Sequence, residues 1–387
     1  MVPVKPHVAA LARVRSREEY EALYARSVAD PAAFWLDQAV IVDWYKAPTV
    51  AMDVDTAAAE FAWYPDGKLN VAYNCVDRHA RLTPDKTAIL WAGNEPGEYT
   101  RISFRELQQR VGRMANVLLA HGVRKGDRVC IYLPMIPEIA VAMLACARIG
   151  AVHSVVFAGF SAEALRGRNA DAGCRVLVTA DEAVRGSKRI PLKAIVDHAL
   201  DAHDSPVTTV LVAKRTNADV PMQAGRDLWL ADELAKQRAT CPPVWMNAED
   251  PLFILYTSGS TGRPKGVLHT TGGYLVYAAS TYAWVFDARP EDVHFCAADA
   301  GWITGHSYIV YGPLCMGVTT VLFESLPTFP DPGRYWQVID DVSATTFYTA
   351  PTALRALLRE GDAWVHAHRR TSLRVIGSVG EPINPEV

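Results

Sequence analysis

The residues with the clearest chemistry form a stretch at 256–266, with the sequence Tyr-Thr-Ser-Gly-Ser-Thr-Gly-Arg-Pro-Lys-Gly. Glycines let a backbone approach a ligand closely, and main-chain N–H groups together with hydroxyls can surround phosphoryl oxygens. Arg263 and Lys265 supply the positive charge that a polyphosphate requires. The stretch therefore predicts a phosphate-binding loop for a nucleoside triphosphate. The expected contacts are Thr257, Ser258, Gly259, Ser260, Thr261, Gly262 and Lys265.

The loop is expected to lie between two ordered elements, because an apolar run at 252–256 precedes it and another apolar segment resumes at Val267. The Walker spacing G-x-x-x-x-G-K-[ST] is not met, since Pro264 precedes the lysine and Gly266 stands where Ser or Thr is required. A Walker-type ATPase is therefore disfavoured. The alternative is a flexible Ser/Gly-rich linker, against which the ordered glycine spacing after a strand argues.

This loop resembles the signature loop of the adenylate-forming acyl-CoA synthetase family, and the continuation at 267–274 is similar to its acetyl-CoA synthetases. The resemblance extends from about Tyr20 to Glu386. It implies that acetate attacks the α-phosphorus of MgATP to give acetyl-adenylate and diphosphate, and that the thiol of coenzyme A then displaces AMP. In that reaction Lys265 and Thr261 would stabilise charge electrostatically, and Mg²⁺ would enter only with ATP.

A second segment, at 298–308, joins a predicted strand to a predicted helix through two glycines. Such a turn places side chains at the ligand-binding edge of a sheet. By themselves, Trp302 is more typical of a core aromatic residue and His306 of a capping or core histidine. The resemblance implies that Trp302, Ile303 and Thr304 line an acetate pocket closed to longer chains. It also implies that Trp302 and Thr304 act in catalysis and that Thr304 approaches coenzyme A.

A third segment follows the predicted strand at 373–376 and contains Gly380, Glu381 and Pro382. Its restricted turn offers backbone donors and acceptors that suit the edge of a purine ring. Without the resemblance, it is typical of an ordinary connection between a strand and a helix. The resemblance implies that these three residues contact the adenine of ATP. It also places Val379 against the methyl group of acetate, which leaves little room for propionate.

A basic run at 184–193 carries four cations. Such a run is usually a solvated helix face. The resemblance instead implies that it receives the phosphates of coenzyme A, although Lys188 stands where relatives carry arginine and so lacks bidentate phosphate geometry. The implied coenzyme A contacts are Arg185, Gly186, Ser187, Lys188, Gly159, Thr304 and Thr328.

The elements that must position these residues alternate between strand and helix patterns, which predicts an α/β fold with two stacked, doubly wound, mostly parallel sheets flanked by helices. Residues 1–69 are expected to form an N-terminal helical arm, capped at Ser16 and Asp30, that packs on the main body. Residues 70–250 would form a first subdomain and 251–387 a second. Helices are expected at 227–238 and 305–316, among others.

Composition excludes several classes of protein. The chain has 387 residues, of which half are hydrophobic, and a net charge of −3 that gives no general attraction to nucleic acid or to anionic membranes. Seven scattered cysteines without a C-x-x-C pair predict neither a zinc site nor a disulfide framework, but buried or idle thiols. The longest apolar run, 139–147, is too short to span a membrane. A cytoplasmic enzyme is therefore expected.

The last residues, Asn384, Pro385 and Glu386, have the pattern of a helix start, and the sequence ends one residue later. We therefore expect an incomplete adenylate-forming large domain without the small C-terminal domain of the family, and no useful rate of acetyl-CoA synthesis. One alternative is a nucleotide-binding fragment or pseudo-enzyme without turnover, whose partner would be a separately encoded C-terminal half. The other alternative is a ligase for propionate or another short acid.

Overall fold

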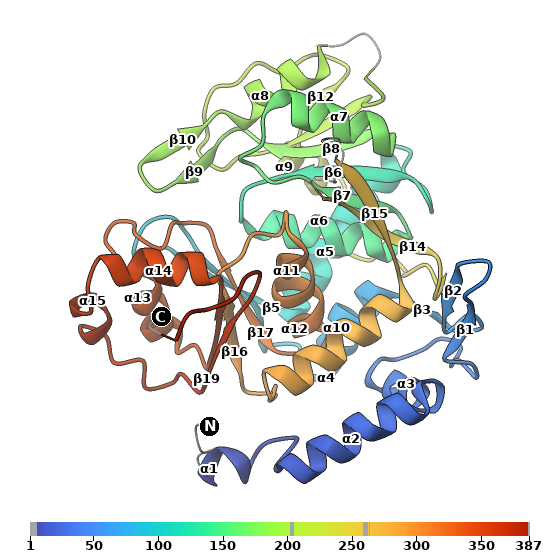
Figure 1. Ribbon diagram of the computed structural model, residues 1–387. Helices are drawn as coiled ribbons and strands as arrows, with labels where there is room; N and C mark the ends of the chain where they lie inside the picture. Colours follow the sequence, from blue (N-terminus) through green and yellow to red (C-terminus); the bar gives the residue numbers. More distant parts are fainter. Residues whose placement is uncertain (1–5, 202–204, 258–261, 263, 386–387) are drawn as a thin grey trace.

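The computed structural model describes residues 6–201, 205–257, 262 and 264–385. Two sheets with flanking helices form the main body of an α/β protein (Figure 1). One sheet has seven strands in the order β12-β11-β8-β6-β7-β14-β15, and the other has six in the order β19-β18-β16-β17-β4-β5. The predicted fold class, two mostly parallel sheets flanked by helices with an N-terminal helical arm, is confirmed.

The seven-stranded sheet is parallel except for the antiparallel pair β14–β15. Its central strands are buried on both faces, as is typical of parallel sheets covered by helices. Its strands are β6 (Arg128–Tyr132), β7 (Val152–Val155), β8 (Val176–Ala180), β11 (Thr209–Ala213), β12 (Asp227–Trp229), β14 (Pro251–Thr257) and β15 (Lys265–Thr270).

Helices cover both faces of this sheet, with α7 and α8 on one side and α5 and α6 on the other (Figure 1). The α6 sequence is apolar nearly all round, and every residue except Glu138 is buried, as expected of a helix inside a large core. Ser103 caps α5 by accepting a hydrogen bond from the backbone N–H of Glu106 (3.2 Å). The bounds are α5 (Phe104–Ala120), α6 (Pro137–Ile149), α7 (Ala162–Ala172), α8 (Leu192–Leu200) and α9 (Leu230–Ala235).

The six-stranded sheet is parallel except for the antiparallel pair β4–β5. Its strands are β4 (Thr87–Ala92), β5 (Tyr99–Ser103), β16 (Val293–Cys296), β17 (Thr319–Phe323), β18 (Thr346–Thr349) and β19 (Val375–Ser378). The helices in this half of the chain are α10 (Gly272–Val285), α11 (Ile303–Gly305), α12 (Gly312–Cys315), α13 (Arg334–Val342), α14 (Pro351–Arg359) and α15 (Ala363–His366).

The strands do not divide between the sheets at residue 250, as the expected subdomains 70–250 and 251–387 required. Strands β4 and β5 come from the first part of the chain but belong to the six-stranded sheet, and β14 and β15 belong to the seven-stranded sheet. Leu90 of β4 pairs with Val321 of β17, and Phe253 of β14 with His153 of β7. Pairing over such separations is decided by packing in three dimensions, which the local sequence pattern does not contain.

Two predicted helices also differ from the structure. In the helix expected at 227–238, the first three residues form strand β12 instead, and Asp227 pairs with Val210 of β11. Only the part that forms α9 is helical. The helix expected at 305–316 is divided into α11, the π-helix η3 (His306–Tyr311) and α12. The basic run contains a hairpin of β9 (Ala183–Arg185) and β10 (Lys188–Ile190) rather than a helix face.

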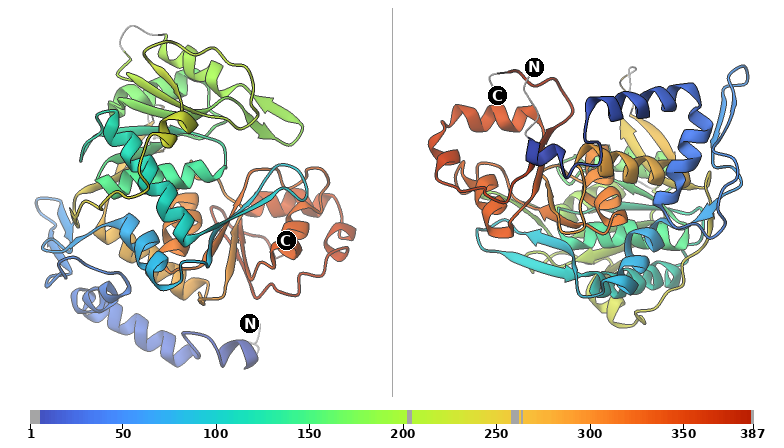
Figure 2. Two further views of the ribbon diagram at one scale, coloured as in Figure 1. Left: turned by 180° about the vertical axis from the view of Figure 1, so that it is seen from behind. Right: turned by 90° about the horizontal axis from the view of Figure 1, so that it is seen from below.

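The N-terminal arm lies along one side of the body, as the separate views in Figure 2 show. Ser16 and Asp30 cap its helices as predicted, by accepting from the backbone N–H groups of Glu19 (3.2 Å) and Ala33 (2.9 Å). Its elements are α1 (Pro6–Ala9), α2 (Arg17–Ala29), α3 (Pro31–Gln38), the 3₁₀-helix η1 (Ala39–Ile41), β1 (Met52–Asp55), β2 (Glu60–Trp63) and β3 (Lys68–Leu69).

Aromatic contacts join the arm to the body. The ring centroid of Trp284 lies 6.2 Å from that of Trp35 and 6.0 Å from that of Phe34. Strand β3 pairs with β13 (Met246–Asn247), and the chain then enters the body through the π-helix η2 (Tyr73–Asp77) and α4 (Arg78–Leu82). The arm therefore contacts the main body through Phe34, Trp35 and β3.

All seven cysteines are buried and free, as the sequence predicts. In the described ranges, none of the helices has both the length and the apolar character needed to cross a membrane.

Candidate functional site

A cavity of about 1010 Å³ opens where strands of both sheets end. In parallel sheets, ligands bind beyond the carboxyl ends of the strands. The segments that follow β6, β7, β16, β17, β18 and β19 all contribute to its walls, together with the end of β14 and the β9–β10 hairpin. The two sheets therefore share one cavity.

Residues from each predicted ligand group line this one cavity. The structure brings together Thr257 and Gly380 from the predicted ATP site, Trp302, Ile303, Thr304 and Val379 from the predicted acetate pocket, and Arg185 and Gly159 from the predicted coenzyme A site. The sequence assigned these residues to separate segments, and the fold places all of them on one surface.

Other predicted contacts do not line the cavity. Lys265 is exposed at the first position of β15, opposite Thr257 in the antiparallel ladder. Thr328 is exposed one residue beyond the lining residue Pro327. Gly186, Ser187, Lys188, Gly262 and Pro382 also lie outside the cavity wall. The predicted contacts Ser258, Gly259, Ser260 and Thr261 lie outside the described residues.

The carboxylate of Glu381 is engaged at the start of α14 instead of in the cavity. It accepts hydrogen bonds from the backbone N–H (2.9 Å) and the hydroxyl of Thr352, and it forms an ion pair with Arg355. The hydroxyl and the guanidinium lower the pKa of this carboxyl. Of this turn, Val379 and Gly380 line the cavity.

The turn after β16 shapes the wall that carries Trp302. The backbone N–H of Gly301 donates to Oδ1 of Asp299 (2.7 Å), and a Cβ at Gly301 would lie 2.9 Å from Cα of Phe157. Only glycine therefore allows this close approach between the turn and the end of β7. The ring of Trp302 packs 6.1 Å from that of Phe157 and remains 49% exposed.

His306 lies behind this wall as a core histidine. It is fully buried, its Nδ1 lies 3.1 Å from the carbonyl oxygen of Trp302, and its ring packs 4.6 Å from that of Phe253. Burial lowers the pKa of His306 to about 4, so the ring is neutral at pH 7, and its Nδ1–H donates a hydrogen bond to the carbonyl oxygen of Trp302. The structure supports a role in holding Trp302, not one as a general base.

Two acidic residues in the cavity wall were not predicted from the sequence. Asp299 is half-buried, and burial raises its pKa to about 6 against the opposing effects of the Gly301 N–H and the Arg185 charge. Glu324 is buried, and burial raises its pKa to about 7 although it is paired with Arg215. The only sequence signal for either residue was an acidic side chain in the turn that follows a predicted strand.

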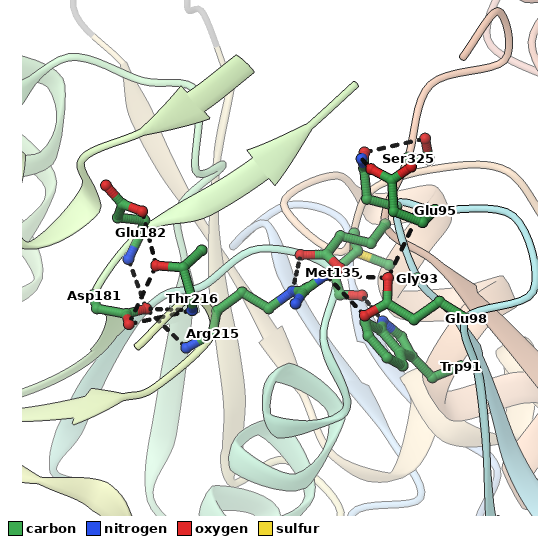
Figure 3. A network of polar contacts seen from close by, with 12 residues as sticks. Trp91, Gly93, Glu95, Glu98, Met135, Asp181, Glu182, Arg215, Thr216 and Ser325 are labelled. Atoms are coloured by element: carbon green, nitrogen blue, oxygen red, sulfur yellow. Dashed lines mark hydrogen bonds and ion pairs between the residues drawn. The ribbon is translucent and has the colours of Figure 1, made fainter. Parts of the chain in front are cut away.

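Arg215 joins two carboxylates beside the cavity (Figure 3). Its Nε donates to Glu324 (2.9 Å), its Nη2 donates to Glu98 (3.2 Å), and its guanidinium lies 5.2 Å from the ring centroid of Trp91. Arg215 is thus shared between two carboxylates, and the charge of the second one, Glu98, adds to the rise in the pKa of Glu324. Local sequence could not reveal this network, because the partners lie 109 and 117 residues away.

The same network ties the two sheets together. The backbone N–H of Arg215 donates to Asp181 (2.7 Å), which follows β8 of the seven-stranded sheet, whereas Trp91 lies in β4 of the six-stranded sheet. The indole of Trp91 donates to the carbonyl oxygen of Met135 (2.9 Å), a residue that lines the cavity. The cavity wall at Met135 and Glu324 is therefore held by contacts from both sheets.

Comparison with known proteins agrees with this arrangement. A family profile described as "AMP-binding enzyme" matches residues 76–387, and one described as "Acetyl-coenzyme A synthetase N-terminus" matches residues 20–75. The chain belongs to the AMP-binding enzyme family. The "AMP-binding enzyme" profile covers both sheets and the whole cavity wall, and the N-terminal profile covers most of the arm.

Curated relatives carry consistent names. The chain is 55% identical over 385 residues to a protein of Magnetococcus marinus named "Acetyl-coenzyme A synthetase", covering 99% of this chain and 60% of the relative. It is 57% identical over 371 residues to "Acetyl-coenzyme A synthetase 2" of Pseudomonas aeruginosa, covering 95% of this chain and 57% of the relative. The chain of this AMP-binding enzyme thus spans about 60% of the length of these relatives.

Proposed function

We propose that the protein acts as an AMP-forming acetate–CoA ligase, which converts ATP, acetate and coenzyme A to acetyl-CoA, AMP and diphosphate. The observation that carries this proposal is the convergence of three predicted ligand groups on one cavity at the ends of the strands. The names of the relatives support the same reaction, with the restriction that this chain corresponds to part of their length.

The nucleotide is proposed to lie between the end of β14 and the end of β19. Thr257 and Gly380 line the cavity from these two strands. Lys265, which pairs with Thr257 in the β14–β15 ladder, is proposed to supply positive charge to the phosphates of the nucleotide. Mg²⁺ is proposed to enter as the counter-ion of ATP.

Acetate is proposed to occupy the part of the cavity near Val379, Trp302 and Ile303. These side chains are apolar and suit a methyl group, while Thr304 adds a hydroxyl to the same wall. An acetate oxygen would form the bond to the α-phosphorus as the bond to diphosphate breaks. The coenzyme A sulfur would then bond to the acetyl carbon as AMP leaves, so no residue of the protein forms a covalent bond.

The coenzyme A phosphates are proposed to bind at the β9–β10 hairpin. Arg185 and Lys188 are directly paired across its two strands, and like charges in that position repel each other. Both side chains are exposed, and Arg185 also lies 5.2 Å above the ring of Phe157, in the cavity wall. A bound phosphate would relieve this repulsion, which favours an anion site over an idle surface.

Calorimetric titration of the 387-residue chain with MgATP and with coenzyme A tests this function. We expect both ligands to bind, and Arg185→Ala to weaken coenzyme A binding by about tenfold, as expected for a lost charge-assisted contact. The exposed Arg101→Ala serves as the control, because Arg101 lies in β5 outside the cavity wall. Absence of coenzyme A binding, or equal losses for Arg185→Ala and Arg101→Ala, would contradict the proposal. Cytoplasmic location stays a prediction.

A further inference from the structure

The β9–β10 hairpin connects the two halves of the body. It follows β8 of the seven-stranded sheet, yet its tip, Gly186 and Ser187, reaches toward the six-stranded sheet (Figure 1). Gly186 is buried there, and a Cβ on it would lie 3.1 Å from Cδ1 of Leu326, which follows β17. Gly186 also has a φ of +61°, so glycine is favoured on two counts. Gly186 is therefore packed against the segment that follows β17.

A single buried side chain both donates a hydrogen bond to the backbone of this tip and accepts one from it. Nδ2 of Asn94 donates to the carbonyl oxygen of Gly186 (3.0 Å), and Oδ1 of Asn94 accepts from the N–H of Gly186 (2.8 Å). Asn94 is 1% exposed and follows β4 of the six-stranded sheet. Because one amide binds both backbone groups of one residue, it fixes the position and the orientation of the tip relative to the other sheet.

The loop that carries Asn94 is itself held by a buried cation. Nη2 of Arg334 donates to the carbonyl oxygens of Gly93 (2.9 Å) and Glu95 (3.2 Å), on either side of Asn94. Arg334 is fully buried, and within the described ranges its hydrogen-bond partners are all uncharged. Burying a charge without a counter-charge is costly. Such a cost favours a dedicated role for Arg334 in fixing this loop.

These contacts lead directly to the two hairpin cations. Arg185 precedes Gly186, and Lys188 follows the two-residue tip, so both emerge from the strand ends that Asn94 holds in place. Arg185 alone of the pair lines the cavity. A shift of the tip would therefore move the guanidinium within the proposed coenzyme A site, where small displacements of a binding group are costly.

We propose that Asn94 is a positioning residue for the coenzyme A phosphate site, which it serves by fixing Gly186 and thereby Arg185 and Lys188. The inference rests on the proposed function for its ligand. It adds that affinity for the coenzyme depends on a contact between the two sheets, made by a residue that lies outside the predicted ligand sites.

The test compares Asn94→Ala with the parent 387-residue chain, using calorimetry with coenzyme A and MgATP and hydrogen exchange of the Gly186 amide. We expect Asn94→Ala to lose about tenfold in affinity for coenzyme A, the size of one well-placed hydrogen bond, while ATP affinity stays within about twofold. The Gly186 amide should exchange faster in the variant, because its acceptor has been removed.

Two further variants separate positioning from general stability. Asn70→Ala is the matched control, because Asn70 is also a fully buried asparagine whose Nδ2 donates to the carbonyl oxygens of Ala147 and Val244, outside the cavity. It should lower stability without selective loss of coenzyme A. Asn94→Asp keeps the acceptor for the Gly186 N–H but turns a carboxylate oxygen toward the Gly186 carbonyl oxygen, and we expect a loss of affinity at least as large as in Asn94→Ala.

Three results would overturn the inference. Unchanged coenzyme A affinity in Asn94→Ala, with normal binding by the parent, would refute Asn94 as a positioning residue and leave the proposed function standing. Equal loss of ATP and coenzyme A affinity would show a purely structural role. Failure of the parent chain to bind coenzyme A would refute the proposed function and the ligand of this inference together.

Discussion

At the residue scale, two carboxyl groups with raised pKa values, those of Asp299 and Glu324, line the cavity. Burial raises the pKa of Asp299 to about 6 and that of Glu324 to about 7. Both carboxyl groups therefore change protonation near neutral pH. Asp299 is influenced by the charge of Arg185, and Glu324 is paired with Arg215. Neither acid could be identified from the sequence, since segments far along the chain create its environment.

The raised pKa of Glu324 predicts a pH dependence of stability. An unfolded glutamate releases its proton near pH 4.3, whereas folded Glu324 keeps it up to about pH 7. Between these values the folded state binds more protons, so this residue's contribution to stability falls as the pH rises. We expect the parent chain to lose stability relative to Glu324→Gln between pH 5 and pH 8, measured as urea midpoints.

The control for this measurement is Glu60→Gln, which changes an exposed carboxylate in β2 of the arm. Its difference from the parent should stay constant over the same pH range. A constant difference for Glu324→Gln as well would show that Glu324 titrates normally in the folded protein.

Lys265 tests the assignment of the phosphate loop. Loss of a charge-assisted contact costs about 1.5–3 kcal/mol, whereas an exposed lysine contributes little to folding. Lys265→Ala should therefore weaken ATP binding and leave AMP binding and thermal stability nearly unchanged. Lys46→Ala, at another exposed position outside the cavity, should change neither affinity. Equal losses of ATP and AMP would exclude Lys265 as a ligand of the β- or γ-phosphate.

Val379 tests the choice of acid. Removing two methyl groups from the cavity wall should make room for about one methylene, which is worth about 1–3 kcal/mol in a hydrophobic pocket. Val379→Ala should therefore shift relative affinity from the acetyl to the propionyl form of a sulfamoyl-adenosine analogue. An unchanged ratio between the two analogues would remove Val379 from the acid pocket and with it the preference for acetate over propionate.

At the scale of elements, the sequence predicted those whose signals are local. The helix caps at Ser16 and Asp30 both appear where their patterns placed them. Sheet membership could not be predicted, because β4 and β14 each pair with strands from the other part of the chain. The β9–β10 hairpin was also hidden, since its tip is stabilised by Asn94, 92 residues away.

At the scale of the whole molecule, the cavity is a joint product of the two sheets. Arg215 bridges Asp181 and Glu324, Trp91 reaches Met135, and Asn94 holds Gly186. The predicted ligand residues on the cavity wall were found from short motifs, whereas the residues that join the sheets were not. Motifs report local chemistry, and the joining contacts depend on side chains brought together only by the fold.

The central claim is that nucleotide, acetate and coenzyme A share this one cavity. The most direct measurement is a crystal structure of the 387-residue chain with 5′-O-(N-acetylsulfamoyl)adenosine and coenzyme A. We predict that the acetyl group lies against Val379 and Trp302, the adenosine beside Gly380, and a coenzyme A phosphate against Arg185. Ligand density in the separate groove formed by Arg110, Glu138 and Leu234, with the strand-end cavity left empty, would contradict the claim.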